Sequence, residues 1–185
     1  MIKTRVENNE VLYSDVAIPY LHQHDIVKLK NLADQNPRKR VRLCTHRSPN
    51  DNSHEMFIVH MKDCYVRPHK HLGKAESVTV LEGEVDVVLF NDNGRLLDVI
   101  HMSDPSGGKS FYYRMSDPIF HSLLIKSKYL VFHEVTTGPF TKKDTVFPDW
   151  APQEDDKKAV DKFINNIQKK VNKSAKSVKG KSFES

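Results

Sequence analysis

Between residues 40 and 137 the chain is a series of short segments with alternating apolar and polar residues, and this feature constrains its fold most. A period of two turns successive side chains to opposite faces, which is typical of half-buried strands. Helical spacing is nearly absent here, so the pattern favours an all-β sandwich or barrel over an alternating α/β fold. The expected strands are 40–46, 56–61, 65–71, 77–81, 84–90, 96–102, 109–113, 120–125 and 129–136. Turn signals between them are Glu82-Gly83, Asn91-Asp92-Asn93-Gly94, Pro105-Ser106-Gly107-Gly108 and Asp117-Pro118.

Residues outside this interval indicate a helix on each side. A short helix is expected to begin at the capping residue Asp25 and to end at Pro37, after a strand or extended arm at 11–18. A second amphipathic stripe follows at Val160, Phe163, Ile164, Ile167 and Val171. We therefore divide the chain into a β-domain with an N-terminal arm and helix (1–152), an amphipathic helix (153–172) and a Lys/Ser-rich tail (173–185) that we expect to be disordered.

Composition and charge exclude several classes of protein. Seven glycines and two cysteines rule out a collagen-like chain or a disulfide scaffold. Most of the net charge of +5 comes from residues 154–185, which contain nine lysines and five acidic residues. That tail lacks interleaved aromatics and nucleic-acid motifs, so no nucleic-acid partner is expected. No apolar run is long enough for a membrane span or a signal peptide, which predicts a cytoplasmic protein.

Histidines and a carboxylate with regular spacing indicate a metal site. The segment 64–84 contains H-x-H-x4-E-x6-G, formed by His69, His71, Glu76 and Gly83. Histidines two apart on a strand face the same side, and a closed barrel would bring His121 from a later strand toward them. Three imidazoles and a carboxylate suit one divalent transition ion: Fe, Mn, Co, Ni, Cu or Zn. An isolated H-x-H is more often a surface or core feature, so the full spacing carries this prediction, and a barrel without metal is the alternative.

This spacing matches the first cupin motif, and Pro118-x-x-His121 resembles a degenerate second one. Residues 22–154 further resemble the WbuC family of cupin-fold metalloproteins, found among bacterial surface-polysaccharide genes. The resemblance rests on NPRKRVRLCTH (36–46), YVRPHKH and VLEGEVDVVLFNDNG (65–94), FHEVTTGPF (132–140) and FPDWAPQE (147–154). Departures are Cys44 for Asn, Phe140 for Tyr, and Lys74-Ala75 before the glutamate. It implies an all-β, cupin-type β-barrel, a jelly-roll-like double-stranded β-helix, with a short N-terminal helix and a C-terminal helix.

Further side chains are candidates for ligand binding. Tyr65 and Arg67 share the parity of the histidine pair, and an arginine fork suits a phosphate or carboxylate. Arg42 is a candidate contact for an anionic sugar-nucleotide. The alternatives are wall packing for Tyr65, a rim salt bridge for Arg67 and a solvated strand face for Arg42.

Two residues are candidate catalytic bases. His46 shares a strand face with Arg42. His133 and Glu134 are adjacent and must point to opposite faces of a strand, and the resemblance favours Glu134 inside, as a carboxylate that orients a ligand histidine.

Three functions remain open from the sequence. The first is a metal-binding cupin that acts on, or binds, a sugar or sugar-nucleotide intermediate of bacterial surface-polysaccharide (O-antigen) biosynthesis. As an enzyme it would be an isomerase or epimerase, with a metal-dependent dioxygenase as the alternative. The second is a non-catalytic small-molecule or saccharide-binding cupin, and the third, a weaker reading, is nucleic-acid binding through the tail. A homodimer is expected by analogy with other cupins.

Overall fold

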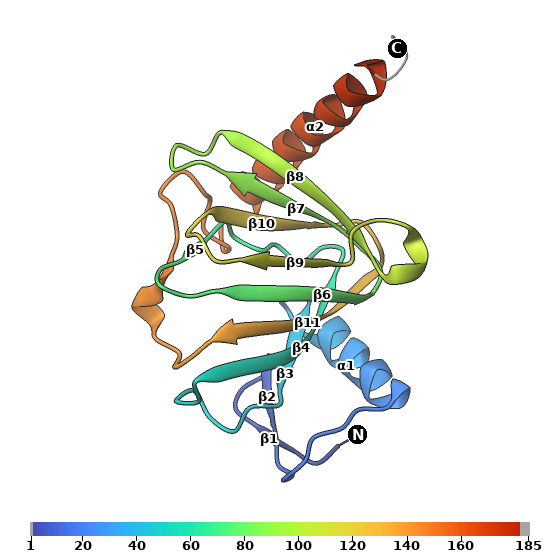
Figure 1. Ribbon diagram of the computed structural model, residues 1–185, viewed down its shortest axis with the longest axis vertical. Coiled ribbons are helices and arrows are strands. Elements are labelled where there is room, and N and C mark those ends of the chain that lie inside the picture. Colours follow the sequence, from blue (N-terminus) through green and yellow to red (C-terminus); the bar gives the residue numbers. More distant parts are fainter. Residues whose placement is uncertain (1, 182–185) are drawn as a thin grey trace.

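The computed structural model describes residues 2–181, and its framework is a large mixed β-sheet packed against a smaller one (Figure 1). The large sheet has the strand order β1-β2-β3-β4-β11-β6-β9. The bounds are β1 Thr4–Val6, β2 Val11–Ser14, β3 Arg40–Cys44, β4 Ser53–Met61, β11 Tyr129–Thr137, β6 Glu76–Glu82 and β9 Tyr112–Met115. Among the named strands of the described residues, β2 and β3 alone pair in parallel, because helix α1 (Gln23–Gln35) connects them as a crossover.

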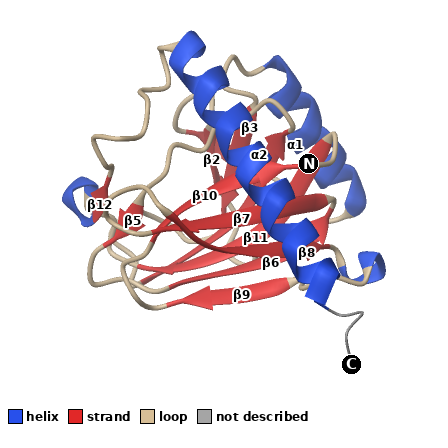
Figure 2. Ribbon diagram, turned by 90° about the horizontal axis from the view of Figure 1, so that it is seen from above, coloured by secondary structure: helices blue, strands red, loops and turns tan. Residues whose placement is uncertain are grey.

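The second layer combines two smaller sheets. One has the order β10-β7-β8, and the other is the pair β12-β5. The bounds are β5 Lys70–His71, β7 Glu84–Phe90, β8 Leu96–Ser103, β10 Phe120–Ile125 and β12 Thr145–Val146, with short 3-10 turns at Pro105–Gly107 and Lys142–Asp144. His69 and His121 exchange two backbone hydrogen bonds, of 3.1 and 2.9 Å, which join the pair to β10. The two small sheets therefore form one continuous wall. Figure 2 shows β5 and β12 side by side, across the view from α1.

The main apolar core fills the space between the two layers. The large sheet contributes Val11, Ile58, Val78, Val80 and Phe132, and the smaller one contributes Val85, Val87, Met102 and Ile125. Burying each such side chain contributes about 1.5–3 kcal/mol. The alternation of β3 places Val41 and Leu43 on the opposite face, where they pack against Leu29 and Ala33 of α1. Arg42 and Cys44 consequently face the interior.

Helix α2 (Lys157–Lys181) covers the outer face of the smaller sheet (Figure 1). Its buried Ile167 and Val171 pack in one cluster with Val88, Phe120 and Leu124. The apolar stripe of the sequence is therefore explained by packing on the barrel wall. Within the described residues, no helix is both long and apolar enough to cross a membrane.

The predicted fold class is confirmed: the chain is an all-β domain with one helix near each end. Strands β7 and β10 have the expected bounds, and β4, β6, β8 and β11 differ from expectation by a few residues at most. The alternation was informative because one face of each strand packs in a core.

Several expected elements were placed wrongly. The strand expected at 65–71 is reduced to Lys70–His71, because Pro68 has no backbone N–H and cannot continue a ladder. The strand expected at 109–113 is Tyr112–Met115, and the arm at 11–18 is a strand only over Val11–Ser14. Strands β1 and β12 are too short for their alternation to be recognised.

Helix α1 begins before Asp25, which is its third residue and not its cap. The N-cap is His22, and the Asp25 carboxylate accepts the backbone N–H of His22 and of Ile2, each at 2.9 Å. Burial raises the pKa of Asp25, but these two hydrogen bonds outweigh burial, so the pKa lies below its usual value. Asp25 thus ties the N-terminal residues to the first helical turn.

Helix α2 is also longer than predicted. The boundary expected at residue 172 is wrong, because the helix continues to Lys181, and the expected disorder of residues 173–181 is not observed. Lysine and alanine have high helix propensity, so the segment can extend a helix already nucleated by packing. The remaining part of the predicted tail, residues 182–185, lies outside the described residues.

Candidate metal centre

Three histidines from different segments converge at one end of the space between the sheets. Ring nitrogens of His69, His71 and His121 all lie within 4.8 Å of one another. His71 belongs to β5 and His121 to β10, whereas His69 lies in the irregular segment bonded to β10. The histidines that the sequence singled out are therefore brought together, although the local structure at His69 is not the expected strand.

Hydrogen bonds fix the orientation of all three rings. The Nδ1 of His69 lies 2.8 Å from the Arg67 carbonyl oxygen, and that of His121 lies 3.0 Å from the Ile119 carbonyl oxygen. A carbonyl only accepts, so each of these Nδ1 atoms carries the proton and leaves Nε2 with a free lone pair. The Nδ1 of His71 lies 3.2 Å from the Thr145 hydroxyl, because β12 pairs with β5 and sets Thr145 opposite His71. This arrangement is the one that metal-ligating histidines adopt.

A buried carboxylate contacts two of these rings. Glu76, the first residue of β6, is 5% exposed. Its Oε2 lies 3.3 Å from Nε2 of His71, and its Oε1 lies 3.2 Å from Nε2 of His121. The hydroxyl of Tyr113, on the neighbouring strand β9, donates to Oε1 at 2.8 Å. The Glu76 carboxylate thus contacts the two imidazoles and also accepts a hydrogen bond from the Tyr113 hydroxyl, which fixes its position.

The electrostatics of the cluster suit a cation. Burial lowers the pKa of His69 to about 3, and the adjacent His121 and His71 act in the same direction. Burial lowers the pKa of His71 as well, but its hydrogen bond to Glu76, together with the negative charges of Glu76 and Glu134, outweighs burial and raises the pKa. For Glu76, burial raises the pKa and the neighbouring imidazoles lower it more, so the carboxyl stays ionised. Oriented imidazole nitrogens and one ionised carboxylate form a donor set that fits a first-row divalent ion.

The cluster opens into a cavity of about 850 Å³ between the sheets, which Glu134 also lines. Glu134 faces the interior, as expected, and burial together with the charge of Glu76 raises its pKa to about 7. His133 faces outward, where its ring lies 4.8 Å from that of Phe57. Among the described residues, Glu134 forms no hydrogen bond with the three histidines, so the structure gives no contact for the expected orienting role.

His46 and Arg42 line the same cavity on the side of β3. The His46 ring stacks on the His54 ring, with a centroid distance of 4.1 Å and an interplanar angle of 5°. The Nδ1 of His46 lies 3.1 Å from the Glu55 carbonyl oxygen. Burial lowers the pKa of His46, which keeps the ring neutral. Arg42 is exposed to the cavity. Both candidates therefore face the space that a ligand would occupy.

Tyr65, expected to bind substrate, does not line the cavity. Its hydroxyl donates to the Pro152 carbonyl oxygen at 3.1 Å, and its ring meets Phe163 of α2 at 6.3 Å. The expected parity was wrong because residues 65–69 do not form a regular strand. Tyr65 instead attaches the segment before α2 to the barrel.

Arg67 lines the cavity, but its guanidinium is used elsewhere. It donates to the Gln153 side chain at 2.8 Å and to the Pro148 and Ala151 carbonyl oxygens at 3.3 Å. It also stacks over the Phe147 ring at 5.0 Å. These contacts hold the segment 147–153, of which Phe147 lines the cavity, so the fork expected to bind a ligand is engaged with the chain itself.

Sequence reasoning missed Tyr113 and Thr145. Both contact the cluster through the pairing of strands distant in sequence, and neither belongs to a recognisable motif. The strand predicted at 109–113 included Tyr113, but nothing in the sequence indicated that this residue contacts Glu76.

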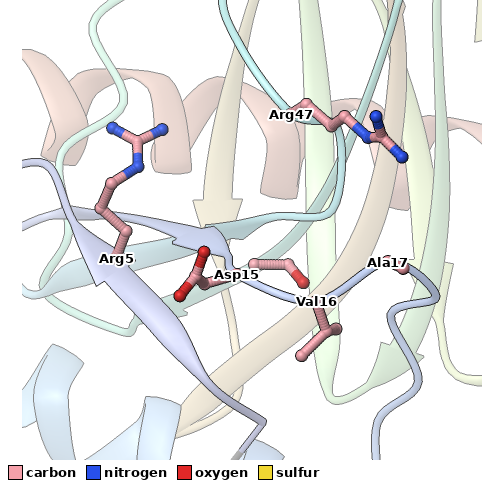
Figure 3. A pocket seen from close by; sticks show the side chains of 6 residues that line it. Arg5, Asp15, Val16, Ala17 and Arg47 are labelled. Carbon is pink, nitrogen blue, oxygen red and sulfur yellow. The ribbon is translucent and has the colours of Figure 1, made fainter.

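A second hollow, of about 370 Å³, lies near the N-terminal strands (Figure 3). Arg5 and Arg47 lie on either side of Asp15 in this view. Arg5 pairs with Glu7 at 3.2 Å, and Asp15 pairs with Lys3 at 2.6 Å. The lining contains no imidazole or thiol, so this hollow lacks the donors of the histidine cluster.

Comparisons with known proteins agree with this architecture. Residues 21–102 match a family described as a domain of unknown function, DUF6016. No curated protein matches. Protein SO0799 from Shewanella oneidensis is similar in structure, with a TM-score of 0.51 and 10% identity over 69% of this chain and 85% of that one. The fold is of the cupin type.

Two larger proteins are also similar in part. Oxalate decarboxylase from Bacillus subtilis has a TM-score of 0.43 and 16% identity, covering 53% of this chain and 24% of its own. The capsular polysaccharide assembling protein CapF from Staphylococcus aureus has a TM-score of 0.44 and 15% identity, covering 54% and 27%. This chain thus spans about a quarter of either protein. The matched family is not described as WbuC, so that finer resemblance stays a prediction.

Proposed function

We propose that this protein is a metal-binding cupin that holds one divalent transition ion at His69, His71, His121 and Glu76 and takes a small polar ligand in the adjoining cavity. The observation that carries the proposal is the set of three imidazoles whose ring nitrogens lie within 4.8 Å of one another, beside an ionised carboxylate. Iron, manganese, cobalt, nickel, copper and zinc all accept such donors.

A bound ion would polarise a carbonyl or hydroxyl oxygen of the ligand as a Lewis acid. The chain itself supplies orientation: Tyr113 holds Glu76, and Thr145 holds the His71 ring. Glu134 faces the ligand space and is our candidate general base, with His46 as the second candidate. A carboxyl whose pKa lies near neutrality is suited to proton transfer.

We further propose a sugar or sugar-nucleotide intermediate of bacterial surface-polysaccharide biosynthesis as the ligand, and a cytoplasmic homodimer as the working form. The support for this finer statement is the sequence resemblance together with the charged and polar side chains among the lining residues of the cavity. A non-catalytic saccharide-binding cupin is the second candidate. It is favoured by one observation: among the hydrogen bonds of the described residues, none joins Glu134 or His46 to the histidine cluster.

Metal content tests the central proposal. We would purify the full chain and quantify transition metals per chain in the wild type and in a His69→Ala/His71→Ala variant. The matched control is His22→Ala/His24→Ala, an exposed pair with the same H-x-H spacing. We expect one ion per chain in the wild type and control and none in the first variant. Equal metal content in all three proteins, or no uptake by the wild type after reconstitution, would contradict the proposal.

A further inference from the structure

Among the described residues, the cavity is lined by four arginines: Arg38, Arg40, Arg42 and Arg67. Two of them are neutralised by carboxylates of the chain. Arg38 and Arg40 each pair with Glu10 at 3.0 Å, and both also pair with Glu154. Arg67 is engaged with the segment 147–153.

Arg42 differs from the other three. Among the described residues, its guanidinium forms no hydrogen bond and no ion pair, although Arg42 lines the cavity. Its position is set by the fold, because Val41 and Leu43 pack against α1 and turn the residue between them toward the interior. A guanidinium in a partly enclosed space attracts an anion more strongly than one on an open surface, since fewer waters screen it.

We infer that Arg42 forms an anion-binding subsite, so that the cavity selects a ligand bearing a carboxylate or a phosphate. The planar fork of arginine matches either group through two parallel hydrogen bonds. Glu134 lies on the same inner face and would accept a hydrogen bond from a ligand hydroxyl. The ligand is then a hydroxylated acid that reaches from Arg42 toward the histidine cluster. The choice of sugars as probes rests on the proposed function.

The test compares sugars that differ in one charged group. The full-length protein is titrated calorimetrically with D-glucose, D-glucuronate and glucose 1-phosphate, at fixed ionic strength. We expect the acidic probes to bind about 10- to 100-fold more tightly than glucose, as charged hydrogen bonds imply. The two acidic arms separate a carboxylate preference from a phosphate preference.

Variants assign the preference to one residue. Arg42→Gln should abolish the preference for acidic probes, and Arg42→Lys should retain only part of it. Arg47→Gln is the matched control, because Arg47 is exposed and lies in the separate hollow of Figure 3. It should leave the preference unchanged.

Two outcomes overturn the inference. One is equal affinity for glucose and the acidic probes, or no binding of either acidic probe at millimolar concentration. The other is an acid preference that survives in Arg42→Gln. Metal content, measured on the same samples, separates this result from the proposed function. An Arg42-dependent preference in a protein without metal would leave the subsite standing and remove the metal site.

Discussion

Replacing Tyr113 by phenylalanine removes one hydroxyl from the wall of the histidine cluster and leaves the ring in place. The ring is 8% exposed, so its packing and the surrounding volume are preserved. What disappears is the 2.8 Å hydrogen bond to Oε1 of Glu76. The carboxylate keeps its contacts with His71 and His121 but loses the donor that orients it on the opposite side.

The magnitude follows from the type of hydrogen bond. A hydrogen bond to a charged group contributes about 1.5–3 kcal/mol. Removing a partner of a metal-ligating residue ordinarily weakens metal affinity by about 10- to 100-fold. Because Glu76 retains two imidazole contacts, we expect the metal affinity to fall by about 10-fold. The free energy of unfolding of the metal-free protein should fall by about 1–2 kcal/mol.

Affinity for Zn²⁺ is measured by competition with a chromophoric chelator, on wild type, Tyr113→Phe and Tyr112→Phe. Tyr112 is the matched control, since it is 49% exposed and its hydroxyl lies 3.3 Å from the Ser77 hydroxyl, outside the cluster. Its variant should bind Zn²⁺ like the wild type. If Tyr113→Phe also bound with unchanged affinity, Glu76 would not depend on Tyr113 for its orientation and the reasoning would be refuted.

Other changes test the packing, the first helix and the site. Trp150→Ala should lower the free energy of unfolding by about 3 kcal/mol, because the ring packs on Phe90 and Phe120, with ring centroids 5.2 and 5.8 Å apart. The measurement is urea unfolding, and the control is Phe111→Ala, at an exposed position. Asp25→Asn should cost about 1–2 kcal/mol at pH 7. Folding lowers the pKa of Asp25, so the carboxylate stabilises the fold at pH values above its unfolded-state pKa, and this stabilisation is lost as pH falls through the folded-state pKa. If the substitution cost the same free energy of unfolding at pH 7 and at pH 3, this account would be contradicted. Saturating Zn²⁺ at 100 times its Kd should stabilise the wild type by about 2.7 kcal/mol and raise its Tm. An equal rise in Tm for His69→Ala/His71→Ala would place the binding elsewhere.

The sequence alone determined where most strands lie and which residues form the candidate metal centre. Period-two alternation identified β7 and β10 with their bounds, because one face of each strand is apolar and packs in a core. The spacing of His69, His71 and Glu76 is local, so it could be recognised without knowing the topology. The stripe of α2 was likewise visible, since its buried residues recur at helical spacing.

Tertiary structure decided the partners of these groups. Tyr113 meets Glu76 through pairing of β6 with β9, and Tyr65 turns to Pro152 through packing of the segment before α2. Arg42 and Arg67 both line the cavity, yet of these two only Arg67 hydrogen-bonds a segment of the chain through its guanidinium. Pairing between distant strands depends on register and loop path, which the alternation of apolar and polar residues does not encode. The fold therefore decides whether a polar side chain finds a partner within the chain or stays available to a ligand.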